Sequence, residues 1–337
     1  MKSREFIGNQ KVVEFLDRTI SDQLFAHAYL FVGPGKLGKF KLASAFAKAA
    51  LCQKGNTLKD INACGVCDSC QQFDKNVHSD FHLLQKEAEK KTISVGEIRV
   101  FQNNFYKTTL LSKRNVGIIN SASELNIEGA NALLKTLEEP PGKSIIILIA
   151  ENVESLPSTV VSRCQIIQFS LVTKSKIRDL LQNSGCDKLK ADTIASLAMG
   201  KPGLAIEYYE DQTKYERYLN DIQELLSLYG SSIPEKFAYV QQYLGSKKYQ
   251  ERIDNTTDLI NYFSLIVHDC ILIKNYLEKQ VVNITALPAL IKLSAKYSFA
   301  ELVSQQKKLY LIREKFANSI NPQLALENYF LTMKSNA

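Results

Sequence analysis

Residues 28–52 read AYLFVGPGKLGKFKLASAFAKAALC, and this stretch decides the fold class of the chain. Its first five residues form an apolar run of aromatic and branched side chains, which predicts a buried strand. After a glycine-rich loop, Leu42, Phe46 and Ala49 recur at the spacing of an amphipathic helix. A strand, a glycine-rich loop and a helix in this order are the context that makes a phosphate-binding loop credible.

Further apolar runs follow the same plan. VGIIN (116–120), SIIILIA (144–150) and CQIIQF (164–169) predict three more strands. Residues 94–105 begin with the spacing of a capping box, and residues 126–142 predict a helix that ends at two prolines and a glycine. Strands that alternate with helices indicate a parallel α/β sheet covered on both faces.

Beyond about residue 171 almost every segment has a helical period. We therefore expect an α/β domain at 1–170, a small helical domain at 171–212 and a larger helical domain at 213–337. The chain has 337 residues, a formal net charge of +7 and no window of eighteen uncharged apolar residues, so we expect no membrane span. The first ten residues lack an apolar signal core, and we expect a cytoplasmic protein.

Four of the seven cysteines are clustered in the pattern C-x11-C-x2-C-x2-C. An odd number of cysteines in a cytosolic chain argues against a disulfide framework, and a redox pair explains only two of the four. Four thiolates at this spacing make a closed tetrahedral site, which predicts structural rather than catalytic zinc. The expected ligands are Cys52, Cys64, Cys67 and Cys70, and the spare candidates, which the site does not need, are His78 and His82.

The loop GPGKLGK (33–39) fits the phosphate-binding pattern G-x-x-x-x-G-K. Gly33 and Gly38 would let backbone amides surround an anion, and Lys39 would reach the outer phosphates. The next residue is Phe40, where a Ser or Thr normally holds magnesium. Since Phe40 has no oxygen, two interpretations stay open for the loop: weak nucleotide binding through Lys39, or a purely structural role.

A second metal-holding position is also changed. An Asp-Glu pair is expected at the end of a later apolar strand, and this chain has Asn120 and Ser121 there. A neutral amide is a poor magnesium ligand, and a serine is a poor general base. Because the metal supplies much of the charge neutralisation in phosphoryl transfer, we expect no independent ATP hydrolysis.

Three longer stretches carry a family resemblance: HAYLFVGPGKLGK (27–39), EGANALLKTLEEPP (128–141) and LPSTVVSRCQIIQF (156–169). Together with the four-cysteine insertion at about 52–82, they resemble the clamp-loader AAA+ proteins of bacterial DNA polymerase III over about residues 5–210. The resemblance implies an AAA+ α/β domain with a zinc module, a three-helix lid and a helical collar that joins a five-membered hetero-oligomeric ring.

Within this family the ATP-hydrolysing gamma/tau subunits keep an arginine in the small helical domain, where this chain has Gly203. The departures are similar to those of delta-prime subunits, which have a zinc module and little or no ATPase activity. The implied partners are gamma/tau and delta-type subunits, the sliding clamp and primed DNA, with no membrane. The resemblance also implies that Arg163 is an arginine finger for a neighbouring subunit's ATP site, and that Ser162 and Cys164 set its turn.

Two other functions stay open on the residues alone. One is an active gamma/tau-like ATPase with an unusual loop, and the other is a zinc-module nucleic-acid-binding protein on a degenerate nucleotide-binding fold. Lys107, Lys113 and Arg114 are more typical of a solvated surface than of a DNA site, so we assign no DNA contact to them. Whether the chain counts as an enzyme also stays open, although the resemblance makes it part of the DNA-directed DNA polymerase III holoenzyme.

Overall fold

The computed structural model describes residues 6–54, 63–86, 92–245, 249–316 and 321–334. It divides into two compact units, one formed by Met1–Leu180 with Gly200–Leu204 and the other by Leu181–Met199 with Ala205–Ala337. Part of the predicted cysteine insertion, residues 55–62, lies outside the described residues. The division into three domains at 170 and 212 stays a prediction.

The first unit is built on a five-stranded sheet in which every pair of neighbours is parallel. The order across the sheet is β2-β3-β4-β1-β5. The strands are β1 (Ala28–Val32), β2 (Phe81–Leu84), β3 (Asn115–Ile119), β4 (Ser144–Ala150) and β5 (Gln165–Gln168). The predicted fold class, a parallel α/β sheet followed by helices, is confirmed.

Strand β2 was not predicted from the sequence. It has four residues, lies at the edge of the sheet and pairs only with β3 among the described strands. Its side chains are partly exposed, unlike the fully buried side chains of β1, β3 and β4. Its residues FHLL include no β-branched side chain, so they carry little local signal for a strand.

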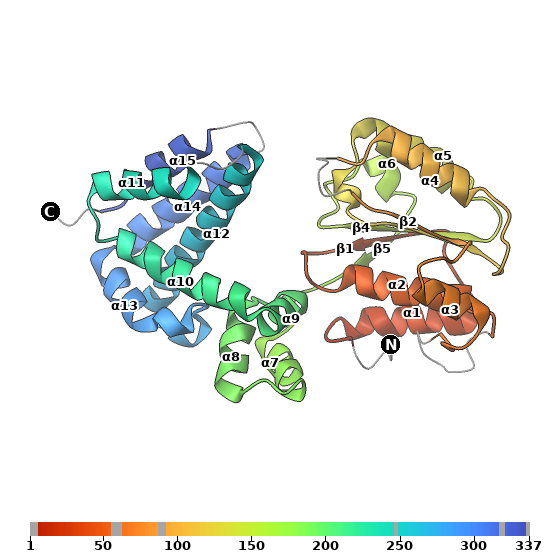
Figure 1. Ribbon diagram of the computed structural model, residues 1–337, viewed down its shortest axis with the longest axis horizontal. Coiled ribbons are helices and arrows are strands. Elements are labelled where there is room, and N and C mark those ends of the chain that lie inside the picture. The colour runs from red at the N-terminus through yellow and green to blue at the C-terminus, as the bar shows by residue number, and fades with distance from the viewer. Residues whose placement is uncertain (1–5, 55–62, 87–91, 246–248, 317–320, 335–337) are drawn as a thin grey trace. The chain divides into compact units, whose positions relative to one another are not determined.

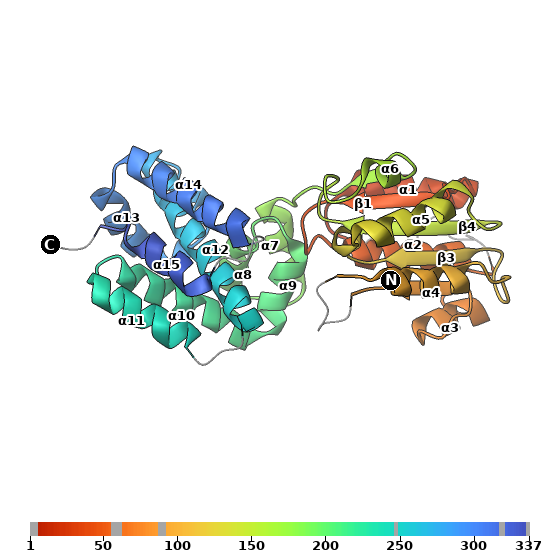
Figure 2. The same ribbon diagram turned by 90° about the horizontal axis from the view of Figure 1, so that it is seen from above.

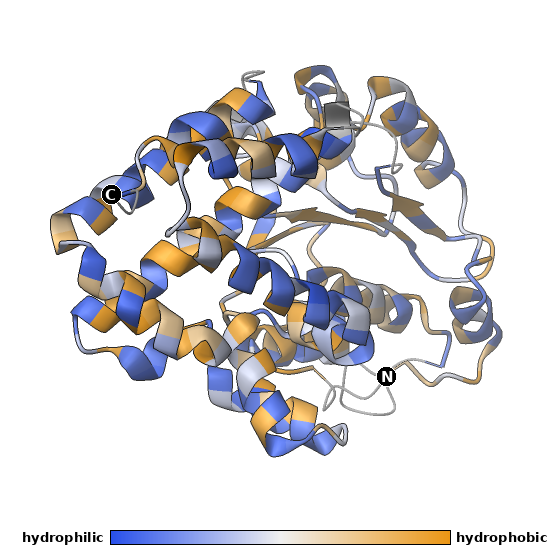
Figure 3. Ribbon diagram, turned by 60° about the vertical axis from the view of Figure 1, so that its left-hand side comes forward, coloured by the Kyte–Doolittle hydropathy of each residue, from blue (hydrophilic) through white to orange (hydrophobic). Residues whose placement is uncertain are grey.

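Helices cover both faces of the sheet (Figure 1). One face carries α1 (Gln10–Asp22), α2 (Lys39–Leu51) and α3 (Asp68–Asp74), and the other carries α4 (Val95–Phe105), α5 (Ile127–Glu138) and α6 (Ser158–Val161). The central strands β1 and β4 are mostly apolar (Figure 3), as expected for strands buried on both faces of the sheet.

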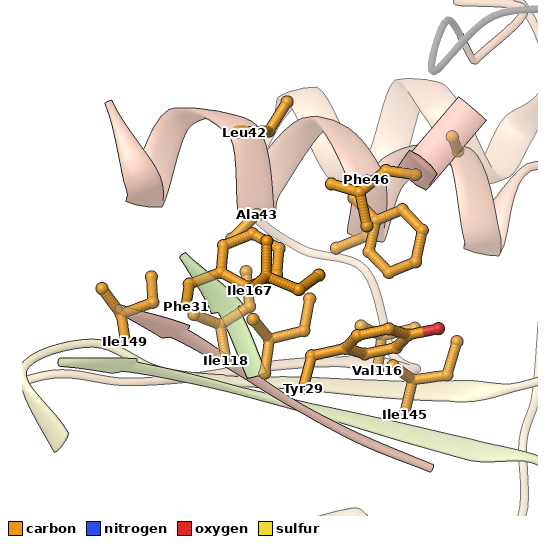
Figure 4. Packing of buried hydrophobic residues seen from close by; sticks show 14 of the residues in the cluster. Tyr29, Phe31, Leu42, Ala43, Phe46, Val116, Ile118, Ile145, Ile149 and Ile167 are labelled. Atoms are coloured by element: carbon orange, nitrogen blue, oxygen red, sulfur yellow. The ribbon is translucent and has the colours of Figure 1, made fainter. Parts of the chain in front are cut away.

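Alternation along β1 divides the core into two layers. Tyr29 and Phe31 point toward Ala43 and Phe46 of α2 (Figure 4), whereas Leu30 belongs to the cluster under α4 and α5. Phe46, one of the residues predicted from helical spacing, thus packs on the sheet, whereas Leu42 lies on the side of α2 away from it. The phosphate loop joins the buried end of β1 to the start of α2, so it has a rigid support on both sides.

The predicted capping box of α4 is present. The Ser94 hydroxyl accepts a hydrogen bond from the Glu97 N–H, and the Glu97 carboxylate accepts one from the Ser94 N–H. Helix α5 begins at an Asn126 cap, whose side chain accepts from the Gly129 N–H, and it ends at Glu138 just before the two prolines. A short 3₁₀ helix, η2 (Ala122–Glu124), follows β3.

The second unit is helical. Around the boundary lie α7 (Lys174–Asn183), α8 (Lys188–Leu197) and α9 (Pro202–Glu210). The remaining helices are α10 (Gln212–Leu228), α11 (Ile233–Leu244), α12 (Tyr249–Lys274), α13 (Leu287–Lys296), α14 (Phe299–Phe316) and α15 (Pro322–Phe330), with the short 3₁₀ helices η3 (Glu278–Gln280) and η4 (Ile284–Ala286).

Helix α12 is the core of this unit. It packs against α13, α14 and α15 (Figures 1 and 2), and Phe263 contacts the rings of Tyr329 and Phe330. Among the described residues this helix alone has the length and hydropathy to cross a bilayer, in the window Glu251–Lys274. Half of that window is buried inside the protein, and a core helix has the same properties.

Candidate functional site

The four clustered cysteines come together in space. Cys52 follows the end of α2, Cys67 caps the start of α3, and Cys70 lies in the first turn of α3. With Cys64, their four Sγ atoms all lie within 4.8 Å of one another, and the Cys52–Cys67 and Cys64–Cys70 pairs are 4.0 and 3.8 Å apart. Zinc bonded tetrahedrally to sulfur at about 2.3 Å places the sulfurs about 3.8 Å apart, so the arrangement fits zinc.

The chemistry of the thiols also suits a metal. All seven cysteines, each of them in the described residues, are free. Burial raises the pKa of the Cys64 thiol, but hydrogen bonds from the backbone N–H groups of Val66 and Cys67 outweigh burial and lower the pKa to about 6. This favours the thiolate, the form that binds zinc, at Cys64, whereas burial raises the pKa of Cys52 and Cys70. Gly65 has a φ of 71°, a conformation that glycine adopts without strain, and it makes the turn between Cys64 and Cys67.

The two histidines are placed elsewhere. The Nε2 atom of His78 lies 2.8 Å from the Ser69 hydroxyl, and the ring of His82 packs edge-on against Phe105. Among the described residues, the group able to hold a metal consists of the four cysteines alone. The expectation that the site does not need His78 or His82 agrees with this arrangement.

The lysine of the phosphate loop forms hydrogen bonds with carbonyls of the same loop. The Lys39 ammonium donates hydrogen bonds to the carbonyls of Gly33 and Pro34, the latter at 2.7 Å. Lys39 is only 7% exposed, and burial lowers its pKa, while the charge of Glu151 raises it. Gly33 and Gly38 both have positive φ, at 146° and 83°. A Cβ on Gly33 would come within 2.5 Å of the Phe169 carbonyl, so only glycine fits there.

A cavity of about 610 Å³ lies over this loop. Its lining includes Phe40, Asn120, Ser121 and Gly203, the four positions at which departures from an ATPase were expected from the sequence. Phe40 is 38% exposed. The cavity thus brings these residues together from three segments that are far apart in the sequence.

Glu151 is a cavity residue that sequence reasoning missed. It directly follows β4, and its Oε1 atom lies 3.1 Å from the position of a Cβ on Gly35. A second carboxylate in the lining, Glu124, lies 3.2 Å from the Lys86 ammonium. Polar residues at the carboxyl ends of parallel strands converge on one edge of the sheet, and this rule could have identified Glu151.

Arg163 lies between α6 and β5, and its side chain is one-third exposed. Its Nη2 atom is 2.5 Å from the Glu138 carboxylate at the end of α5, and its Nη1 atom donates to the Thr159 carbonyl at 2.8 Å. The Ser162 hydroxyl donates to the same carbonyl at 3.2 Å. Cys164 packs against the apolar cluster under α5, and burial raises the pKa of its thiol to about 12.

Two family models match the chain. The first, described as DNA polymerase III, delta subunit, matches residues 8–173, and the second, described as DNA polymerase III, delta subunit, C terminal, matches residues 240–335. The chain belongs to the DNA polymerase III delta-subunit family. The first match contains every residue predicted for a site from the sequence, and with the sheet order it confirms the AAA+ α/β fold class.

Individual relatives of this delta-subunit family member are similar over parts of its length. DNA polymerase III subunit delta' of Pseudomonas aeruginosa is 38% identical over 139 residues, 41% of this chain and 42% of its own. Subunit delta' of Bacillus subtilis is 33% identical over 171 residues, 51% and 50% of the two chains. Subunit gamma of Buchnera aphidicola is 27% identical over 243 residues, 70% and 65% of the two chains. The chain thus spans half or less of the two delta' relatives.

Proposed function

We propose that this chain is a subunit of a DNA polymerase III clamp loader that does not hydrolyse ATP itself. The observation that carries the proposal is the state of the phosphate loop. The Lys39 ammonium is bonded to carbonyls of its own loop, and Phe40 lies where a metal-holding oxygen would be. A magnesium triphosphate would therefore lack the oxygen that normally holds its metal, and Lys39 would have to leave its own loop to reach the outer phosphates.

The second part of the proposal is that Arg163 acts at the ATP site of a neighbouring subunit. Thr159 and Glu138 hold the guanidinium near the protein surface, and a third of the side chain stays exposed. A guanidinium held in this way can neutralise charge that develops on a γ-phosphate from another protomer. Ser162 and Cys164 fix the turn that presents it, one through a hydrogen bond to Thr159 and the other through burial.

The proposed partners are gamma/tau and delta-type subunits in a hetero-oligomeric ring, and through that ring the sliding clamp and primed DNA. This role places the protein in the cytoplasm. Cys52, Cys64, Cys67 and Cys70 would hold a structural zinc ion, because four sulfur ligands leave no open position for a reacting water. The metal would stabilise the turn between α2 and α3 rather than take part in phosphoryl transfer.

The test uses the complex reconstituted with the partner ATPase subunits. Arg163→Ala should leave assembly intact and lower the ATPase rate of the complex by about 10³-fold, the usual effect of losing an arginine finger. Arg99→Ala, at an exposed arginine on α4, controls for the loss of one positive charge and should leave the rate unchanged. An unchanged rate in the Arg163 variant would remove Arg163 from the mechanism.

A separate measurement tests the first part. The purified chain, incubated alone with ATP and magnesium, should show no turnover above background. Turnover of about 1 s⁻¹ or faster, within the usual range for enzymes, would instead identify an active ATPase of the same family.

A further inference from the structure

A buried polar network lies directly beside the cysteine cluster. Its three central side chains are Ser69, His78 and Asp80, which are 1%, 5% and 1% exposed. Ser69 lies between Cys67 and Cys70 on α3, whereas Asp80 precedes β2. The network thus connects the metal-binding segment with the edge of the sheet, and neither the zinc site nor the phosphate loop explains it.

Asp80 binds the backbone of a loop that is distant in the sequence. Its carboxylate accepts hydrogen bonds from the N–H groups of Leu110 at 2.8 Å, Leu111 at 2.9 Å and Ser112 at 2.6 Å. The Ser79 hydroxyl donates a fourth, at 3.0 Å. Burial raises the pKa of Asp80, but these donors outweigh it and hold the pKa below its usual value. Asp80 is therefore a carboxylate that fixes residues 110–112.

The protonation of His78 follows from its partners. The Asp80 N–H donates to His78 Nδ1 at 3.0 Å, so in the neutral ring the proton is on Nε2. Nε2 then donates toward the Ser69 and Ser112 hydroxyls, at 2.8 and 3.2 Å. Burial lowers the pKa of His78, which favours this neutral form.

Both hydroxyls donate a hydrogen bond to the same acceptor. Ser69 and Ser112 donate to the Leu51 carbonyl at 2.8 and 2.9 Å. Leu51 is the last residue of α2 and directly precedes Cys52. The network therefore holds the segment of Cys52 through Leu51, and the segment of Cys67 and Cys70 through Ser69.

We propose that Asp80 and His78 are positioning residues for the metal site, which they join to loop 110–112 as one cooperative unit. This inference rests on the proposed zinc site. Side chains that orient metal ligands from behind typically change metal affinity by about 10- to 100-fold when they are replaced. The coupling is reciprocal, so removal of the metal loosens the N–H groups of Leu110, Leu111 and Ser112.

The first experiment measures zinc affinity by competition with a chromophoric chelator, using the full-length chain and zinc alone. Asp80→Asn keeps the shape of the side chain but turns an amide N–H toward backbone donors, and it should weaken zinc binding about 10- to 100-fold. Ser69→Ala removes the link to Leu51 with little disturbance, and it should weaken binding in the same direction. Zinc affinity equal to wild type in both variants would overturn the proposal.

The chain offers a matched control in Asn115. This buried side chain donates hydrogen bonds to the carbonyls of Phe105 and Lys107, at 3.2 and 2.8 Å, and so holds the other end of the same loop without touching the network. Asn115→Ala should destabilise the protein and leave zinc affinity within about threefold of wild type. If Asn115→Ala weakens zinc binding as much as Asp80→Asn, the effect comes from general destabilisation and the proposal is wrong.

Hydrogen exchange gives an independent readout. With zinc bound, the N–H groups of residues 110–112 should be protected, and after chelation they should exchange at least tenfold faster, while β4 stays protected. Unchanged protection of residues 110–112 after chelation would contradict the coupling. Failure of the wild-type chain to bind zinc at all would instead refute the proposed zinc site, so the two failures are distinguishable.

Discussion

Gly203 offers a sharp test, because it lies where the resemblance places an arginine of the ATP-hydrolysing subunits. It is the second residue of α9, and its N–H donates to the Lys36 carbonyl in the phosphate loop at 2.9 Å. A Cβ at this position would lie 2.8 Å from that same oxygen. We predict that Gly203→Ala destabilises the α/β unit, although alanine is the better helix former.

Two opposing contributions decide whether Gly203→Ala raises or lowers the free energy of unfolding. Replacing glycine by alanine in a helix gains about 0.5–1 kcal/mol. Relieving a backbone contact of 2.8 Å requires the loop and α9 to separate by roughly 0.5 Å, and such overpacking costs about 1–3 kcal/mol. The separation also lengthens the Gly203–Lys36 hydrogen bond, which is worth about 0.5–1.5 kcal/mol. The expected net loss is about 1–2 kcal/mol.

The assay is urea unfolding of the purified chain, with hydrogen exchange at position 203 as a local readout. Gly96 is the matched control, because it is the second residue of α4 and its Cβ would meet only the Ser94 hydroxyl, at 3.8 Å. Gly96→Ala should therefore be neutral or stabilising by up to about 1 kcal/mol. If Gly203→Ala is as stable as Gly96→Ala, the close approach of α9 to the phosphate loop does not constrain this residue.

Three further predictions concern the metal, the phosphate loop and a buried charge. The purified chain should carry one zinc ion by metal analysis, and Cys67→Ser should lose it whereas Cys186→Ser, at a buried cysteine of the other unit, should not. Glu151→Gln should lower the pKa of Lys39 further, since it removes the carboxylate whose charge raises that pKa, and an unchanged Lys39 titration measured by NMR would argue against this role. Lys236 is fully buried, its ammonium has no partner among the described residues, and burial lowers its pKa. Lys236→Met should raise the free energy of unfolding at pH 7 by about 1–3 kcal/mol. Because the pKa of Lys236 is lower in the folded state, the buried ammonium destabilises the protein at pH values below that folded-state pKa. The stability gained by Lys236→Met should therefore shrink as the pH rises toward about 10.4, the usual pKa of lysine. A gain that does not change with pH would contradict this explanation.

Local patterns in the sequence were sufficient for much of the fold. Strands β1, β3 and β4 were predicted to within one residue, because buried apolar runs have a strong local signal. Strand β5 was predicted equally well from its two adjacent isoleucines, although three of its four residues are exposed. The capping box of α4 was predicted for the same reason, since its two residues are three positions apart. Strand β2 was missed because its residues FHLL include no β-branched side chain, unlike those of β5, which is equally short and also lies at an edge.

The cysteine site could be predicted from the sequence only in part. The C-x-x-C spacings bring Cys64, Cys67 and Cys70 together through one turn, so the sequence alone could identify them. The position of Cys52 relative to them depends on how α2 packs against α3, which is a tertiary contact. The network behind the site, from Leu51 to Asp80 and loop 110–112, has no spacing pattern and could not have been predicted.

The sequence by itself determined the parallel α/β sheet, the phosphate loop, the cysteine cluster and the absence of a metal-holding oxygen at Phe40. Only the tertiary structure decided that Lys39 binds its own loop, that Glu151 faces Gly35 and that Gly203 lies against Lys36. The physical reason is the range of each interaction. Periodicity and turns are set by neighbours along the chain, whereas the residues around the phosphate loop meet only when separate strands end at the same edge of the sheet.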